Sequence, residues 1–310
     1  MRVAVIGRTR MLLKAAEEII ARGHEVPFLW TAKAAEHSET TENEFQDFAL
    51  KINATFACAA RISSEDNLTL LRNAACDIAI SVNFPSLLPN SVLAIFPNGI
   101  LNAHCGDLPR YRGNACPSWA ILNEEKEVGL CVYLMTANLD DGPIVSRSIM
   151  LLNNDTYISD IYTWMETVIP DMLAQAAEDV VKGNAVLQPQ SSLPKSILRV
   201  FPRRAEDGKI DWKLNVENVM RLVRASSRPF RGAFTTLEGK QNVTIWRAEP
   251  YPVQYEFSAV PGQVCLSINA DPVIACSDGM IRLLDVTVEG FADNVSSKKK
   301  ILSSFRNRLI

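Results

Sequence analysis

The chain has 310 residues, 47% of them hydrophobic and 22% charged, which is the composition of a globular protein long enough to form two cores. No apolar run approaches the roughly 20 residues of a membrane-spanning helix, and the N-terminus lacks the charged and apolar segments of a signal peptide. The seven cysteines show neither disulfide nor zinc spacing. These properties predict a cytoplasmic protein without a bound metal.

The charge of the chain is unevenly distributed, although the net charge is only -3. Residues 1–190 carry 14 Lys and Arg against 23 Asp and Glu, whereas residues 191–310 carry 18 against 12. The whole surface is therefore not that of a nucleic-acid-binding protein. The basic excess of the second part keeps a polyanionic partner open for that part alone.

The first part of the chain alternates between strand-like and helix-like patterns. Helical periodicity covers residues 11–22 and 64–74. Apolar strand-like runs surround these helices, at residues 2–6, 25–30, 77–82 and 99–104. Strands that alternate with helices predict an α/β domain with a Rossmann-like, mostly parallel sheet covered on both faces. The segment Gly7-Arg8-Thr9-Arg10 lacks the glycine pattern of dinucleotide-binding loops, so a nicotinamide or flavin cofactor is not expected.

The pattern changes in the second part of the chain. Strand-like residues 129–135 and 143–151 and a long helical pattern over 156–183 complete a predicted domain of residues 1–190. A polar segment then predicts a linker over 191–202. One helix and several short strand-like runs separated by Gly, Pro and Asp follow, which predicts a small, OB-like β-barrel domain over 203–310.

Two polar residues end the strand-like run at 99–104. Asn102 and His104 are two positions apart, so strand alternation places both side chains on the same face of the sheet. A loop with glycine and proline follows them, and a second turn, from Asn138 to Gly142, comes directly after a later strand. That turn supplies Asp140 as a carboxylate that could approach the imidazole.

An amide, an imidazole and a carboxylate suit acyl transfer to an amine. Asn102 can donate a hydrogen bond to the oxygen on which negative charge develops. His104 can move the proton that the amine must lose, because the unperturbed pKa of histidine is about 6.5. Asp140 would orient the ring and favour its protonated form. No covalent intermediate is required.

Simpler interpretations stay open from these residues alone. An Asn-x-His at the end of a strand can be a hydrogen-bonded turn, and an Asp-Gly turn between strands is ordinary hairpin chemistry. Cys105 and Cys116 flank the loop and allow a cysteine nucleophile, but a small buried thiol explains them as well.

The sequence resembles the 10-formyltetrahydrofolate-dependent formyltransferases at these residues. The run LNAHCGDLPRYRGNACPSWAI is similar to that family's signature, and the later LDDGPIV is similar to its Asp-x-Gly turn. The resemblance implies roles for Asn102 as oxyanion stabiliser, His104 in proton transfer and Asp140 as the carboxylate that tunes the histidine, with Asp141 a bystander. It also implies that 10-formyltetrahydrofolate is the cosubstrate. The residues expected to contact the folate are Ser86, Leu87, Leu88, Thr136, Ala137, Asn138, Leu139 and Asp140.

The second part of the chain resembles the C-terminal domain of methionyl-tRNA formyltransferase and of the enzyme that formylates UDP-aminoarabinose, in FPRRAEDGKIDW, RLVRASSRPFRGAFT and NVTIWRAE. Initiator tRNA formyltransferases have a basic insertion after the second strand, whereas residues 34–47 here are acidic, which disfavours binding of a tRNA stem. We therefore expect a sugar N-formyltransferase whose acceptor is the amine of a nucleotide-linked amino sugar.

Arg110 and Arg112, in the loop beside His104, could bind the diphosphate of such an acceptor. Asn114 stands where the aminoarabinose enzyme has an arginine, and Asp107 could contact an amine. The sequence leaves open initiator tRNA as the acceptor, a formyltetrahydrofolate hydrolase, a folate-binding protein without catalysis, and a homodimer. It also leaves open whether the second domain binds the nucleotide, forms a dimer contact or is a vestigial remnant.

Overall fold

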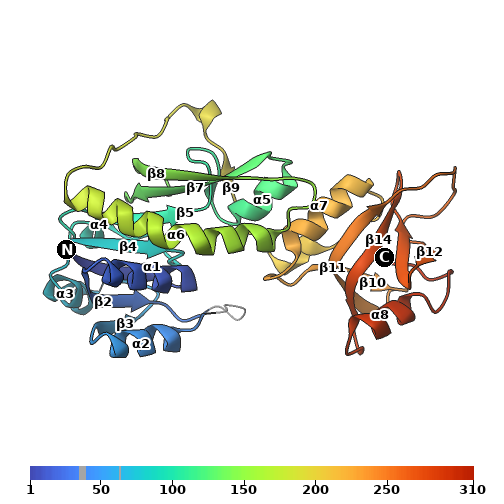
Figure 1. Cartoon of the computed structure of the whole chain (residues 1–310), viewed down its shortest axis with the longest axis horizontal. Coiled ribbons are helices and arrows are strands. Elements are labelled where there is room, and N and C mark those ends of the chain that lie inside the picture. Colours follow the sequence, from blue (N-terminus) through green and yellow to red (C-terminus); the bar gives the residue numbers. More distant parts are fainter. Residues whose placement is uncertain (35–39, 63) are drawn as a thin grey trace. The chain divides into compact units, whose positions relative to one another are not determined.

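The structure, a computed structural model, describes residues 1–34, 40–62 and 64–310 (Figure 1). The chain forms two compact units. The first unit comprises Met1–Cys116, Glu127–Leu151 and Tyr162–Phe201, and the second comprises Pro117–Lys126, Leu152–Ile161 and Pro202–Ile310. The linker over 191–202 stays a prediction about where the chain can be divided.

A seven-stranded sheet in the order β3-β2-β1-β4-β5-β7-β8 forms the centre of the first unit. Its strands are β1 (Arg2–Gly7), β2 (Glu25–Thr31), β3 (Thr55–Cys58), β4 (Ile78–Val82), β5 (Ile100–His104), β7 (Glu127–Leu134) and β8 (Ile144–Leu151). The first five strands are parallel, whereas β7 runs antiparallel to β5 and β8 antiparallel to β7. This arrangement confirms the predicted mostly parallel α/β sheet.

Helices cover both faces of this sheet (Figure 1). They are α1 (Arg10–Ala21), α2 (Glu42–Lys51), α3 (Glu65–Asn73), α4 (Asn90–Leu93) and α6 (Ile158–Val181). Ala4 and Ile6 point to one face, into a core that includes Leu68 of α3 and Val92 of α4. Alternation directs their neighbours to the other face, where α1 packs on β1, β2 and β4. In α1, the side chain of Thr9 caps the first turn by accepting from the backbone N–H of Leu12.

Two short segments bring the predicted linker back to the first unit. Strand β6 (Arg112–Gly113) pairs in parallel with β9 (Arg199–Val200), and the 3₁₀ helix η1 (Pro194–Ser196) precedes β9. Gly113 has a φ of +118°, and a Cβ there would lie 2.1 Å from the carbonyl oxygen of Val200. Glycine is therefore required at this crossing. Helix α5 (Cys116–Leu122) follows it.

The second unit contains an antiparallel five-stranded sheet in the order β10-β11-β14-β13-β12. The strands are β10 (Ala233–Leu237), β11 (Gln241–Tyr251), β12 (Val264–Ile268), β13 (Asp271–Ala275) and β14 (Met280–Val288). The C-terminal residues close the sheet, because Leu309 pairs with Leu237, the last residue of β10, and Arg308 pairs with Gln263, directly before β12. Both edges are thereby covered, which gives the small barrel that the sequence predicted.

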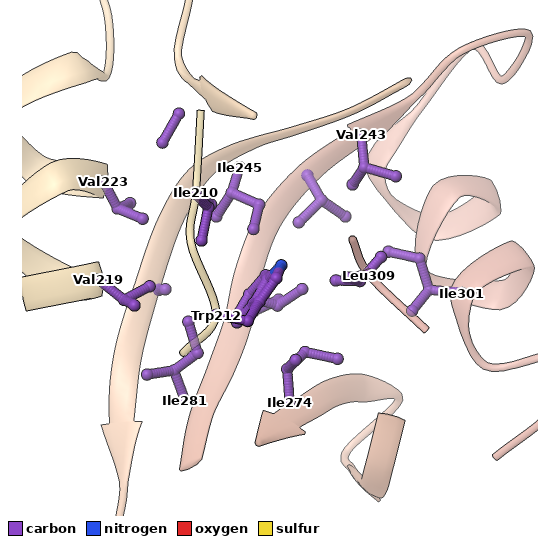
Figure 2. Close-up of a cluster of buried hydrophobic side chains, with 14 of the residues drawn as sticks. Ile210, Trp212, Val219, Val223, Val243, Ile245, Ile274, Ile281, Ile301 and Leu309 are labelled. Carbon is purple, nitrogen blue, oxygen red and sulfur yellow. The ribbon is translucent and has the colours of Figure 1, made fainter. Parts of the chain in front are cut away.

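The core of the second unit surrounds the indole of Trp212 (Figure 2). Side chains reach it from α7 (Val216–Ser226), the barrel strands, α8 (Asn294–Ile301) and the C-terminal Leu309. The indole Nε1–H donates to Thr235 Oγ1 at 3.1 Å, so its one polar group is satisfied. The 3₁₀ helix η2 (Ala205–Gly208) leads into this core. Within the described ranges, no helix is both long and apolar enough to span a membrane.

Candidate active site

Strand β5 positions the two polar residues that the sequence singled out. Asn102 and His104 alternate with the buried Leu101 and Ala103, and both are partly exposed. The strand lies between parallel β4 and antiparallel β7, and His104 is its last residue. Both side chains therefore lie near the carboxyl end of a central strand, where ligands bind in sheets of this kind.

His104 is almost enclosed, with 10% of its side chain exposed. Its Nε2 lies 2.6 Å from the carbonyl oxygen of Tyr111, which can only accept, so Nε2 carries a proton and donates it. Its Nδ1 faces Asp140, with 3.7 Å between Nδ1 and Oδ2. The Sγ of Cys116 lies 3.6 Å from Nε2 and donates to the carbonyl of Tyr111 at 3.1 Å. Cys116 is thus a small buried thiol in contact with the imidazole.

The surroundings of His104 favour its charged form. Burial alone would lower its pKa, because an imidazolium loses solvation inside the protein. The sulfur of Cys116, the carboxylate of Asp140 and the carbonyl of Tyr111 outweigh burial and raise the pKa of His104 to about 9. The ring is therefore protonated at neutral pH, which differs from the near-neutral value expected for a free histidine.

Asp140, rather than Asp141, faces the histidine. Its side chain is 9% exposed and receives two hydrogen bonds, from the backbone N–H of Gly113 to Oδ2 at 2.8 Å and from the hydroxyl of Tyr133 to Oδ1 at 2.7 Å. Asp141 instead accepts from Thr136 Oγ1 and, at 2.9 Å, from Asn138 Nδ2. Asp141 thereby braces the turn that presents Asp140.

Asn102 joins the same hydrogen-bond network. Its Nδ2 donates to the hydroxyl of Tyr133 at 3.3 Å, and that hydroxyl donates onward to Asp140. The structure therefore brings together Asn102, His104 and Asp140, which lie up to 38 positions apart in the sequence. Their catalytic roles stay a proposal.

Two glycines make this close packing possible. A Cβ on Gly106 would lie 2.6 Å from His104 Nε2 and 2.5 Å from the carbonyl oxygen of Tyr111. A Cβ on Gly142 would lie 1.7 Å from the carbonyl oxygen of Leu134. The loop after β5 and the turn after β7 can therefore approach their neighbours only with glycine at these positions.

The residues expected to contact a folate differ in exposure. Leu88 is 2% exposed and packs in the core of the first unit, whereas Leu87 is 57% exposed. Ser86 Oγ donates to the carbonyl of Ala60 at 2.8 Å. In the turn after β7, Ala137 and Asn138 are exposed, and Thr136 and Leu139 are partly exposed.

The residues expected to bind the acceptor are also differently placed. Arg110 and Asn114 are exposed, and the Arg110 guanidinium lies 5.6 Å from the centre of the Tyr111 ring. Arg112 donates through Nε and Nη2 to Gln190 Oε1, at 3.1 and 2.7 Å, so its guanidinium is partly used within the protein. Asp107, suggested as a contact for an amine, pairs with Arg147 at 2.5 Å.

Sequence reasoning missed two residues of this network, Tyr133 and Gln190. Tyr133 stands directly opposite Asn102 in the β5–β7 ladder, a register that the two strand patterns alone do not specify. Gln190 lies in the polar segment near the predicted linker and donates to the carbonyls of Asp140 and Gly142, at 2.9 and 2.8 Å. Nothing in its local sequence distinguishes it from a solvated linker residue.

No group of three or more His, Cys, Asp or Glu side chains suited to holding a metal ion occurs in the part of the chain that the structure describes.

Comparison with solved structures shows the same fold in several proteins. An N-formyltransferase from Helicobacter canadensis, in complex with folinic acid and dTDP-3-aminofucose, has a TM-score of 0.65 and 14% identity over 91% of this chain and 98% of its own. WlaRD, a sugar 3N-formyltransferase in the presence of dTDP and 5-N-formyl-THF, has a TM-score of 0.64 and 15% identity over 94% of this chain and 99% of its own.

HypX from Aquifex aeolicus, in complex with tetrahydrofolic acid, has a TM-score of 0.65 and 18% identity over 98% of this chain but 47% of its own length. The chain thus spans about half of the HypX chain that it matches. At these identities the likeness concerns the fold.

Family models match most of the sequence. Residues 1–176 match the formyl transferase model, and residues 203–293 match the model of the formyl transferase C-terminal domain. The first of these alone covers more than half of the 310 residues. The chain therefore belongs to the formyl transferase family.

Proposed function

We propose that this enzyme transfers the formyl group of 10-formyltetrahydrofolate to the primary amine of a nucleotide-linked amino sugar. The observation that carries the proposal is the convergence of Asn102, His104 and Asp140 in one hydrogen-bonded, nearly enclosed cluster of a formyl transferase. Asn102 supplies a hydrogen-bond donor, His104 a proton, and Asp140 a fixed negative charge.

The chemistry forms a bond between the amine nitrogen and the formyl carbon and breaks the bond between that carbon and the folate nitrogen. During the attack, an N–H of Asn102 and the charge of the His104 ring stabilise the formyl oxygen as it becomes negative. His104 then gives a proton to the departing nitrogen and regains the proton that the amine loses. Because Nε2 is used by the Tyr111 carbonyl, we assign this transfer to Nδ1.

Cys116 and, after it, Asp140 favour the charged form of His104 at neutral pH. The Asp140 carboxylate lies 3.7 Å from Nδ1 and is fixed by the donors of Gly113 and Tyr133. A carboxylate that is already hydrogen-bonded need not reorganise when the ring changes its charge, which lowers the cost of the proton transfer. The pKa of about 9 of His104 agrees with this role.

For the formyl donor, the backbone of residues 136–140 and the exposed side chain of Leu87 are the proposed contacts. The turn is braced by Asp141 and so offers a fixed row of backbone groups, and Leu87 offers an apolar surface to a planar ring. Because Leu88 lies in the core, we assign it support of this segment rather than contact. Similar proteins crystallised with folates support a folate donor.

For the acceptor, two observations favour a nucleotide sugar. Two similar proteins were crystallised with dTDP or a dTDP-sugar, and Arg110 is an exposed cation in the loop that holds His104. Of the acidic segment 34–47, residues 35–39 lie outside the described residues, but Glu42 and Glu44 are seen at the start of α2. Two carboxylates there do not suit a tRNA phosphate backbone.

The acceptor is tested by release of tetrahydrofolate from 10-formyltetrahydrofolate, with nucleotide-linked 3-amino and 4-amino sugars and charged initiator tRNA offered separately. Release that depends on one of the sugars is the expected result. Release that depends on tRNA would replace the proposed acceptor, and equal release without any acceptor would identify a hydrolase.

The catalytic residues are tested by Asn102→Ala and His104→Asn. Each removes a group whose proposed interaction with the substrate strengthens in the transition state, so we expect the turnover number to fall by about 10²–10³-fold for Asn102→Ala, as for other oxyanion donors. Asn90→Ala, at an exposed position at the start of α4, is the matched control and should leave turnover unchanged. Turnover near that of the unmodified enzyme in both site variants would refute the mechanism.

A further inference from the structure

We propose that Tyr133 is a positioning residue that fixes the orientation of the side-chain amide of Asn102. A directed chain of hydrogen bonds runs from Asn102 through Tyr133 to Asp140 and turns the N–H group of Asn102, rather than its oxygen, toward the formyl group. This inference rests on the proposed roles of Asn102 and Asp140 in the transfer.

The backbone places Tyr133 and Asn102 side by side. Asn102 and Tyr133 are direct partners in the antiparallel ladder of β5 and β7, so their side chains project from the same face of the sheet. The tyrosine is 2% exposed and packs with Leu108, Cys131 and Ile144. Its hydroxyl therefore has a fixed position between the two strands.

The direction of the hydrogen-bond chain from Asn102 to Asp140 follows from which groups can donate a proton. An ionised carboxylate only accepts, so the one proton of the Tyr133 hydroxyl must point to Asp140 Oδ1, 2.7 Å away. The hydroxyl oxygen can then only accept from Asn102. Asn102 must consequently present Nδ2, at 3.3 Å, and not its carbonyl oxygen.

This arrangement decides what Asn102 offers to a ligand. The amide nitrogen carries two hydrogens, and one of them is used by Tyr133. The second is left for the formyl oxygen. The opposite orientation of the amide would place two oxygens against each other where negative charge develops, and would raise the barrier instead of lowering it.

The protonation state of Tyr133 agrees with this assignment. Burial first, and then the charge of Asp140, raise the pKa of the tyrosine well above its ordinary range. The hydroxyl thus keeps its proton throughout the range in which the enzyme would be assayed. The titratable groups that face it are Asp140, Asp141 and, on the far side of Asp140, His104 of β5.

The test is Tyr133→Phe, which keeps the ring and removes only the hydroxyl. Without it, the Asn102 amide can turn over at little cost, so we expect the turnover number to fall about tenfold or more, but less than for Asn102→Ala. KM for 10-formyltetrahydrofolate should change little, because the donor hydrogen acts on the transition state. Tyr157→Phe is the matched control: its hydroxyl donates to the Ala248 carbonyl at 3.0 Å, in the second unit.

A double-mutant cycle separates positioning from a general structural effect. If Tyr133 acts through Asn102, then Tyr133→Phe should reduce turnover no further in a protein that already carries Asn102→Ala. Additive losses would mean that Tyr133 acts by another route and would overturn the inference. So would an unchanged turnover in Tyr133→Phe when Asn102→Ala is inactive, whereas full activity in both variants would refute the proposed function itself.

A second measurement does not depend on whether a variant of Tyr133 folds. In the unmodified enzyme labelled with ¹⁵N, the side-chain amide protons of Asn102 should exchange with solvent more slowly than those of the exposed Asn90. The Asn102 signal is identified by its loss in Asn102→Ala. Equal exchange rates for the two residues would contradict a fixed Asn102 amide.

Discussion

At the scale of single residues, the backbone around His104 adopts conformations that non-glycine residues seldom take. Tyr111, Ala115 and Asp140 have φ values of 59°, 56° and 51°. Such residues cost free energy and persist only where their surroundings hold them, and they cluster at functional sites. Here Tyr111 presents its carbonyl to Nε2, and Asp140 presents its carboxylate to Nδ1. The left-handed conformations therefore set the two contacts of the imidazole.

The raised pKa of His104 predicts a pH dependence of stability. The ring has a pKa of about 9 in the folded protein and about 6.5 when unfolded. A group with a raised folded pKa stabilises the protein fully below its unfolded pKa, and this contribution is lost as the pH rises through the folded value. The free energy of unfolding of the native protein should thus decrease, relative to that of His104→Asn, between about pH 6.5 and pH 9.

Urea denaturation of both proteins at closely spaced pH values measures this difference. Titrating groups that do not contact His104 are shared by the two proteins and cancel, whereas the loss of the contact with Tyr111 adds an offset that does not depend on pH. A difference between the two proteins that stays constant over this range would show that the surroundings of His104 do not favour its charged form.

At the scale of elements, the segment between α6 and β9 completes the candidate site. Gln190 donates to the carbonyls of Asp140 and Gly142 and accepts from Arg112, so one side chain joins the turn after β7 to the loop after β5. In Gln190→Ala the two carbonyls lose their donor, which should lower the free energy of unfolding by about 1–3 kcal/mol. We expect turnover to fall several-fold and the backbone amides of residues 138–142 to exchange faster with solvent.

The comparison variants make the Gln190 experiment specific. Gln188 is exposed and pairs with Ile144 through its backbone alone, so Gln188→Ala should behave like the native protein. Gln190→Glu keeps a partner for Arg112 but cannot donate to the carbonyls. It should therefore be at least as impaired as Gln190→Ala, and recovery of activity by glutamate would assign the role of Gln190 to Arg112 instead.

The strands and the segment before β9 show which site residues can be predicted from local sequence patterns. Alternation in residues 99–104 predicted correctly that Asn102 and His104 share a face, because that depends on one strand alone. Tyr133 was missed because its position depends on the register between β5 and β7. Gln190 was missed because a polar segment that returns to the sheet has the same composition as a solvated linker.

At the scale of the whole molecule, helix α7 in the second unit binds segments from much earlier in the chain. Ser118 Oγ donates to the Ala225 carbonyl at 3.1 Å, and Arg221 forms an ion pair with Glu124. The hydroxyl of Tyr157 reaches the Ala248 carbonyl. The short, closely spaced strand patterns predicted the barrel, but these contacts join residues about 70 to 110 positions apart, which no local pattern reports.

Arg224 offers the sharpest test of this long-range assembly. It is 8% exposed, and its Nη1 donates to the carbonyls of Asn153 and Thr156 at 3.0 and 3.2 Å. Arg224→Ala would leave two carbonyls without their donor and remove the packing of a long side chain, so we expect the free energy of unfolding to fall by about 2–5 kcal/mol. Arg228, shortly after α7, is the matched control: its side chain is 59% exposed, pairs with Asp285 and lies 4.2 Å from the centre of the Trp246 ring, so Arg228→Ala should cost about 1 kcal/mol. Chemical denaturation of the full chain compares the two, and equal losses would mean that residues 152–161 do not depend on α7 for their place in the second unit.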